Sequence, residues 1–320
     1  MTEHDRPVGR SLEDFESPTP LGPDGVEAGS VLAGFDSSGL LRWGNRRLRP
    51  LPWRSVRDPW AILASEVMLQ QTQAARVEPK WEEFLRRWPT PVACARAPLA
   101  DVLLVWQGLG YPRRARSLWS CAREIVERFD GNVPSDPGAL RSLPGIGAYT
   151  SRAVAVFAFE AEVGVVDTNI ARVLARQAGR RLTPRQAQML ADELVPAGSS
   201  WLHNQSIMEV GSVLCRPTPR CDECPIAMSC AWRGAGRPDP DPAVGSAGVS
   251  GRQAAFEGSD RQARGRILHA LGGGPREESE LILASGLRAE PARARALLSG
   301  LAAEGLVSVV RRTDRYRLGS

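Results

Sequence analysis

The alternation of hydrophobic and polar positions divides the 320-residue chain into distinct parts. Residues 1–38 show no periodicity and are rich in Pro, Gly, Ser and acidic residues, so we expect a disordered acidic tail. Between 39 and 232 apolar residues recur at helical spacing and strand patterns are scarce. Residues 233–256 have the Pro, Gly, Ala and Ser content of a linker, and 257–320 form a separate small unit.

The periodicity of the central part predicts a mainly α-helical body. Its helices are expected over 60–77, 98–106, 114–129, 136–142, 150–159, 168–178, 184–195 and 204–214. In the last part, the expected elements are helices over 259–271, 277–285 and 291–304 and a hairpin over 306–310 and 316–319. Three helices and a hairpin are the order of a winged helix, which contacts DNA in many proteins. A plain structural appendage is the alternative interpretation.

Charge adds a candidate partner to this picture. The net charge of +5 is uneven, because residues 1–40 carry −6 and the remaining 280 residues carry +11. A basic body favours a polyanion such as nucleic acid, although general solubility explains it equally well. The chain has no run of eighteen apolar residues and no apolar signal core, so we expect a cytoplasmic protein that is not associated with a membrane. With nucleic acid as the partner, we expect it at the nucleoid.

Four cysteines within sixteen residues predict a metal or cluster site. Cys215, Cys221, Cys224 and Cys230 are spaced C-x5-C-x2-C-x5-C, and such thiols in a cytosolic chain are seldom disulfides. Structural zinc prefers two CxxC knuckles, whereas a single CxxC with outlying thiols favours a [4Fe–4S] cluster in a loop over 215–230.

Two carboxylates stand in unusual settings. Glu66 lies in the helical stretch ILASEVMLQQT, with Ile62 and Leu63 one turn before it. A carboxylate on an apolar face is costly unless it reaches water or is used in chemistry. Asp167 follows the apolar run 163–166 and precedes a helix, where it could be a plain N-cap. Two carboxylates in different surroundings can supply one acid and one anion.

The stretch LPGIGAYTSRAV, which begins at Leu143, is typical of a helix-hairpin-helix spanning about 136–159. Gly145 and Gly147 allow the backbone to approach a phosphate closely, and the N–H groups at the start of the second helix can bind the anion.

These residues together resemble the endonuclease III superfamily of DNA glycosylases and, within it, the adenine DNA glycosylase (MutY) family. The motifs that carry the resemblance are LPWR (51–54), SEVMLQQTQ (65–73), GLGY (108–111), LPGIGAYT (143–150), VVDTN (165–169) and the cysteine loop. The resemblance implies a two-lobed helix-hairpin-helix glycosylase body over 39–232 with a [4Fe–4S] cluster. The 60 C-terminal residues are too few for the Nudix-like domain that many members carry.

The resemblance also implies an activity and its residues. Adenine paired with 8-oxoguanine or guanine in double-stranded DNA would be flipped into a pocket and removed. Glu66 would protonate adenine N7 as general acid, and Asp167 would stabilise the oxocarbenium-like sugar. Asn169 would hold its neighbours in place by hydrogen bonding. Tyr149 stands where lyase members carry a catalytic Lys, and Lys80 is the only Lys in the chain, which implies a monofunctional enzyme.

Further residues match substrate-contacting positions of the family. Those expected near the adenine pocket are Arg49, Trp53 and Gln205, and those expected near the opposing purine are Gln71, Thr72, Leu109 and Tyr111. Ordinary turn packing is the alternative for Leu109 and Tyr111. Arg113, Arg114 and Arg116 are expected at phosphates. The competing functions are a thymine mismatch glycosylase on the same fold and a non-enzymatic iron–sulfur DNA-binding regulator. The family likeness implies a monomer.

Overall fold

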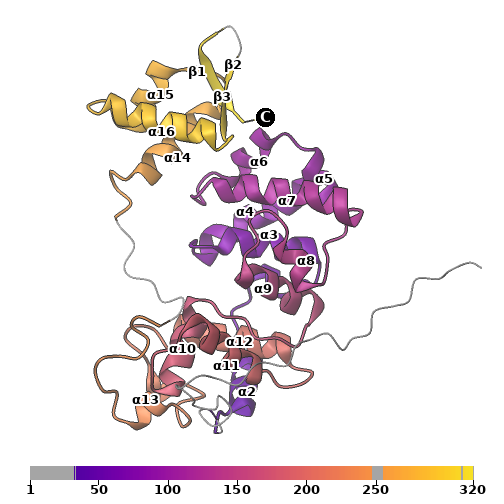
Figure 1. Ribbon diagram of the computed structural model, residues 1–320, viewed down its shortest axis with the longest axis vertical. Coiled ribbons are helices and arrows are strands. Elements are labelled where there is room, and N and C mark those ends of the chain that lie inside the picture. Colours follow the sequence, from indigo (N-terminus) through magenta and orange to yellow (C-terminus); the bar gives the residue numbers. More distant parts are fainter. Residues whose placement is uncertain (1–31, 33, 247–254, 311–312, 320) are drawn as a thin grey trace, which may run out of the picture.

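The structure is a computed structural model that describes residues 32, 34–246, 255–310 and 313–319. It is mainly helical, as predicted, with one small sheet near the C-terminus. Figure 1 shows two helical lobes joined end to end and a third, small domain beside the first lobe. Most of the acidic tail lies outside the described residues, and the first described helix begins at Ser37.

The first lobe is built from seven helices around one apolar core. They are α3 (Pro59–Leu69), α4 (Ala74–Arg87), α5 (Pro91–Arg96), α6 (Leu99–Trp106), α7 (Arg113–Phe129), α8 (Pro137–Arg141) and α9 (Ala148–Phe159), with a 3-10 turn, η1 (Pro52–Arg54), before them. Helix α3 begins where the Asp58 side chain accepts from the Ala61 N–H and Pro59 occupies the first turn. Because α3 is buried on nearly all sides, it forms the centre of this lobe.

The second lobe has a core of its own, which includes Leu40, Ile170, Leu174 and Val210. Its elements are α2 (Ser37–Arg47), α10 (Thr168–Ala178), α11 (Pro184–Glu193), α12 (Ser200–Val213), η2 (Cys221–Glu223) and α13 (Ala231–Gly234). Helix α2 precedes the first lobe in sequence but packs against α12 in the second (Figure 1). The chain therefore passes twice between the lobes, before α3 and after α9.

The C-terminal domain contains three helices and a three-stranded antiparallel sheet. These are α14 (Asp260–Leu271), β1 (Arg276–Glu277), α15 (Glu278–Ser285), α16 (Pro291–Ala303), β2 (Val307–Val310) and β3 (Arg315–Leu318), with the strands in the order β1-β3-β2. The sequence predicts the hairpin of β2 and β3, whereas it does not predict the short β1. Ile267, Leu271 and Leu306 are buried in the same core cluster as the first lobe, so the domain is docked beside α6 (Figure 1).

Two sequence predictions differ from the structure. The single helix expected over 60–77 is broken after Leu69, because Gln71 adopts a left-handed conformation (φ 54°) that ends α3 and starts a turn. The linker expected over 233–256 begins as packed structure. Asp241 pairs with the buried Arg176, and Ser246 accepts from the backbone N–H of Leu182. In the part of the chain that the structure describes, no helix has the length and apolarity to cross a membrane.

Candidate active site and cysteine pocket

Glu66 is buried in the first lobe and is only 5 % exposed. The explanation that its carboxyl group reaches water is therefore wrong. Burial raises the pKa of Glu66 to about 7, and the nearby charge of Asp167 acts in the same direction. A hydrogen bond with Tyr149, on α9, opposes this rise in the pKa. Glu66 Oε2 has no hydrogen-bond partner among the described residues.

Asp167 lies at the passage between the lobes, where it caps α10. Its Oδ1 accepts from the Ile170 N–H at 2.7 Å and its Oδ2 accepts from Asn169 Nδ2 at 3.0 Å. Burial raises the pKa of Asp167, while these hydrogen bonds and the charge of Arg172 counteract the rise. The N-cap interpretation is thus confirmed, and the same carboxylate acts on the pKa of Glu66 through its charge.

The buried side chain of Asn204 fixes the segment that leads into Asp167. Its Oδ1 accepts from the Val165 N–H at 2.8 Å, and its Nδ2 donates to the Val163 carbonyl at 3.0 Å. This amide lies on α12, so the second lobe holds the short extended stretch in register. The two carboxylates consequently come from elements that are fixed independently, one from each lobe.

An arginine pair surrounds another buried carboxylate, Glu209, near Glu66. Glu209 is 1 % exposed and forms ion pairs with Arg49 and Arg54. Arg54 also donates to Gln205 Oε1 at 2.7 Å, and its charge lowers the pKa of Glu66. Arg49 and Gln205 are therefore linked through Arg54 and Glu209. Trp53 is buried and lies edge-on to Trp81 with ring centroids 6.0 Å apart.

The two segments expected to meet the opposing purine lie side by side. Thr72 Oγ1 donates to the Leu109 carbonyl at 3.1 Å. Arg114 ties the segments together through six acceptors, which are the carbonyls of Val67, Met68, Gln70, Leu109 and Gly110 and the hydroxyl of Thr72. The Arg114 guanidinium group is therefore engaged by these two loops, whereas we expected it to contact a phosphate. Leu109 is 4 % exposed and packs in the core, whereas Tyr111 is half-buried with φ 48°.

The helix-hairpin-helix consists of α8, the turn 142–147 and α9. Gly145 has φ 78°, and a Cβ at this position would lie 2.5 Å from the Ser117 Cβ, so a side chain is excluded. Gly147 precedes the first residue of α9 and is exposed, and a Cβ on it would meet no other atom within 4 Å. The turn therefore offers an open backbone at a helix start.

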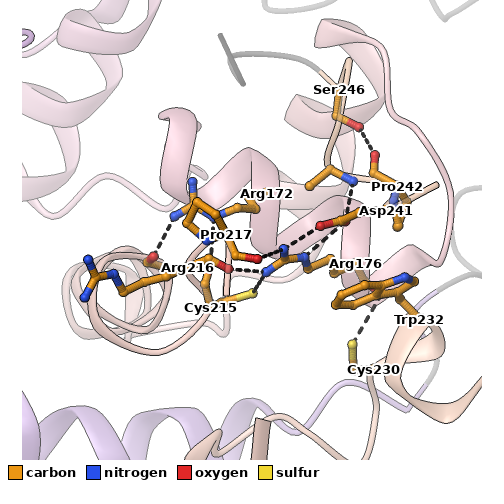
Figure 2. A network of polar contacts seen from close by, with 12 residues as sticks. Arg172, Arg176, Cys215, Arg216, Pro217, Cys230, Trp232, Asp241, Pro242 and Ser246 are labelled. Atoms are coloured by element: carbon orange, nitrogen blue, oxygen red, sulfur yellow. Dashed lines mark hydrogen bonds and ion pairs between the residues drawn. The ribbon is translucent and has the colours of Figure 1, made fainter. Parts of the chain in front are cut away.

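All four cysteines of the loop are free thiols that line one pocket, together with apolar residues such as Val173 and Ile226. Arg176, 1 % exposed, donates to Cys215 Sγ at 3.4 Å and pairs with Asp241, while its guanidinium lies 4.6 Å from the Trp232 ring centroid (Figure 2). Within the described residues, no three His, Cys, Asp or Glu side chains are close enough to hold a single metal ion.

A buried arginine joins this pocket to the surroundings of Asp167. Arg172 Nη2 donates to Asn169 Oδ1 at 2.8 Å, and its Nε donates to the Cys215 carbonyl at 2.6 Å. Because Asn169 also donates to Asp167, a continuous chain of hydrogen bonds runs from the cysteine loop to the N-cap of α10.

Sequence reasoning missed Glu209 and gave no role to Arg54. The signal that singled out Glu66 was available for Glu209 as well, since it follows Ile207 and Met208 in a helical stretch and precedes Val210. A buried carboxylate requires a cation nearby, and Arg54 in the LPWR motif is that cation.

The chain is similar to known DNA repair proteins in both sequence and structure. The family described as "HhH-GPD superfamily base excision DNA repair protein" matches residues 64–197. An adenine DNA glycosylase of Mycobacterium tuberculosis (strain CDC 1551 / Oshkosh) is 45% identical over 245 residues, which cover 74% of this chain and 78% of that protein. The adenine DNA glycosylase of Mycolicibacterium smegmatis is 41% identical over 274 residues, covering 84% and 91%. Among solved structures, a thermostable thymine-DNA glycosylase superposes with a TM-score of 0.58 at 28% identity, covering 62% of this chain and 95% of that one.

Proposed function

The chain belongs to the adenine DNA glycosylase family of base excision repair enzymes, and on this basis we propose that it removes adenine paired with 8-oxoguanine or guanine in double-stranded DNA. The observation that carries the proposal is the buried Glu66, whose pKa of about 7 lets it hold and give up a proton near neutral pH. Hydrolysis of the N-glycosidic bond needs such a proton on the departing base.

In the proposed reaction, Glu66 gives its proton to N7 of the flipped adenine, which turns a poor leaving group into a good one. Tyr149 orients the Glu66 carboxyl group through their hydrogen bond. Asp167 remains ionised and stabilises the positive charge that develops on the sugar. Water then adds to C1′ of the sugar and gives up a proton, which leaves the abasic site. The Ile170 N–H, the Asn169 amide and the charge of Arg172 all favour its anionic form, whereas Glu66 has fewer such partners.

The reaction is proposed to stop at the abasic site. A lyase step needs an amine for a Schiff base, and Tyr149 has none. Lys80, the only lysine, lies on α4 and pairs with Glu83 at 3.3 Å. We therefore assign no strand cleavage to this chain.

Recognition is proposed to involve three surfaces. Arg49, Arg54, Gln205 and Glu209 form the polar side of the adenine pocket. Gln71, Thr72 and Tyr111 face the opposing purine, with Tyr111 as the side chain that enters the base stack, whereas the buried Leu109 supports this turn from the core. Gly145 and Gly147 bring backbone N–H groups to a phosphate.

Cys215, Cys221, Cys224 and Cys230 are proposed to hold a [4Fe–4S] cluster. Their common pocket, the apolar residues around it and the Arg176 donor beside a sulfur atom support this assignment. The cluster would crosslink the loop through four iron–sulfur bonds. Protein purified without oxygen should contain about four iron atoms per chain and absorb near ~410 nm. Cys221→Ser should lose this absorption and Cys94→Ala, which changes a buried thiol outside the pocket, should keep it.

The decisive experiment is single-turnover excision on duplexes that carry A:8-oxoG, A:G, T:G or A:T, with and without alkali. We expect adenine release from the first two, with strand breaks only after alkali. Glu66→Gln should bind the mispaired duplex and fail to excise. Release of thymine from T:G alone would replace the proposal with the thymine mismatch activity, and strand breaks without alkali would contradict the monofunctional assignment.

A further inference from the structure

The C-terminal domain is docked on both sides of the turn that presents Tyr111. At the end of α6, Gln107 Oε1 lies 2.9 Å from His269 Nδ1 of α14. At the start of α7, Arg113 pairs with Glu304 at 2.5 Å and Arg116 donates to the Glu304 carbonyl at 2.6 Å. The turn 108–111 therefore lies between two contacts that belong to another domain.

One side chain of that domain reaches Tyr111 itself. Arg261, in the first turn of α14, donates from Nη1 to the Tyr111 hydroxyl at 3.0 Å. Its guanidinium carbon lies 5.7 Å from the Tyr111 ring centroid and 5.2 Å from that of the exposed Phe256. Arg114 approaches the same tyrosine ring at 5.4 Å. Two cations thus contact one aromatic ring, which fixes its orientation.

Tyr111 needs such support, because its backbone is in the left-handed region (φ 48°), where a bulky residue is strained. A ring that enters a base stack binds more tightly if it already has one orientation before contact. Otherwise part of the binding free energy is lost in ordering the ring. Among the described residues no carboxylate forms an ion pair with Arg261, whereas Arg113, Arg264 and Arg293 of this region each pair with at least one. Its charge therefore remains available to a phosphate backbone.

We propose that Arg261 is a positioning residue that holds the Tyr111 ring in the orientation needed to enter the duplex at a mispair. The C-terminal domain is then part of the mispair-recognition surface. This inference rests on the proposed role of Tyr111 in the preceding subsection, and it adds a residue outside the glycosylase body on which discrimination depends.

The test compares two duplexes that differ only at one pair. One carries 2′-fluoro-deoxyadenosine opposite guanine, which resists excision, and the other carries the same nucleotide opposite thymine. Both have 2-aminopurine beside the pair, whose fluorescence rises when its stacking is disrupted. The measured quantities are the ratio of the two dissociation constants and the fluorescence change.

The variants are Arg261→Ala, Arg261→Lys, Tyr111→Phe and the double variant Arg261→Ala/Tyr111→Phe. Arg293→Ala is the matched control, because Arg293 lies in the same domain and pairs with Asp260.

We expect Arg261→Ala to lower the discrimination ratio about five- to tenfold and to reduce the fluorescence change, since a hydrogen bond and a cation–π contact are lost. Arg261→Lys should recover part of the loss, and Arg293→Ala should match the wild type. In the Tyr111→Phe background, removal of Arg261 should cost less, because the hydroxyl contact is already absent.

An unchanged ratio for Arg261→Ala, tighter binding of the mispair, or additive effects in the double variant would overturn the inference. Adenine release is measured separately on cleavable duplexes. A wild-type chain that discriminates the mispair but releases no adenine would refute the proposed reaction and leave the test of Arg261 valid. Equal binding of both duplexes by the wild type would refute both proposals.

Discussion

The hydroxyl group of Tyr149 is hydrogen-bonded to the carboxyl group of Glu66, and the two side chains come from two adjoining helices of the first lobe, α9 and α3. This bond stabilises the ionised form of Glu66 and so lowers its pKa, against the larger effect of burial, which raises it. The balance leaves the pKa at about 7. A general acid with this pKa is half protonated near neutral pH.

The dependence of excision on pH follows from this balance. In the proposed reaction the protonated form of Glu66 is the active one. The single-turnover rate on saturating A:G duplex should therefore be level below about pH 6 and fall roughly tenfold per unit above about pH 8. Tyr149→Phe removes the contact that lowers the pKa, so the midpoint of the fall should move to higher pH. A midpoint that moves to lower pH would show that Tyr149 acts in another way.

The burial of Glu66 also makes stability depend on pH. The folded pKa of about 7 exceeds the ordinary value of 4.5 for a glutamate, so the unfolded chain ionises first. The contribution of Glu66 to stability is complete below about 4.5 and is lost as the pH rises to about 7. Relative to the wild type, Glu66→Gln should therefore gain about 3 kcal/mol in the free energy of unfolding across this window. Urea denaturation at several pH values measures it, with the exposed Glu127→Gln as the control that should show little change.

The arginine pair around Glu209 predicts unequal effects of two similar substitutions. The Arg54 side chain is 8% exposed and the Arg49 side chain is 46% exposed. Arg54→Ala leaves a buried carboxylate with a single partner that is about half exposed, and should cost about 3 kcal/mol of stability. Arg49→Ala should cost about 1 kcal/mol or less, because Arg54 still pairs with Glu209. Equal losses in chemical denaturation would contradict this prediction and show that Arg49 contributes as much to the pairing as Arg54 does.

Substitutions of the two hairpin glycines should affect different properties, with a loss of stability at Gly145 and a loss of DNA affinity at Gly147. Gly145→Ala places a methyl group against Ser117 in a backbone conformation that disfavours it, and should lower the free energy of unfolding by about 1–3 kcal/mol. Gly147→Ala has free space within the protein, so its stability should remain close to that of the wild type while duplex affinity falls several-fold. Tight duplex binding by Gly147→Ala would exclude close phosphate contact at this position.

The sequence predicted the helical class, the hairpin and the proximity of Glu66 to Asp167, because each depends on local periodicity or on a family motif. It could not predict the break after Leu69. The residues from Ala61 to Leu69 have no helix-breaking type at their end, and the turn is held by Arg114 from a distant helix. Burial of Glu66 was likewise undecidable from sequence, since its neighbours Tyr149 and Asp167 are about 80 or more positions away in the chain.

The linker prediction was wrong near its start for a related reason. Pro and Gly between 233 and 246 are typical of a free connection, yet Asp241 is needed to neutralise Arg176, which the second lobe buries. The amino-acid composition of a segment indicates which conformation it prefers in isolation. It does not show that a buried charge elsewhere in the chain, here Arg176, needs a partner from that segment. The docking of the C-terminal domain through Glu304 and Arg261 could not be predicted either, because these contacts join segments that are far apart in the chain.

Arg114 donates to both the turn after α3 and the turn before α7. The lengths of these two turns are consequently coupled, because an insertion in either would leave carbonyl groups of the other without their shared donor. Grafting one turn from a relative to alter base preference should therefore fail unless the second turn and Arg114 are transferred with it. Under the proposed contact of both turns with the opposing purine, chimeras designed to change substrate preference should exchange the two turns together.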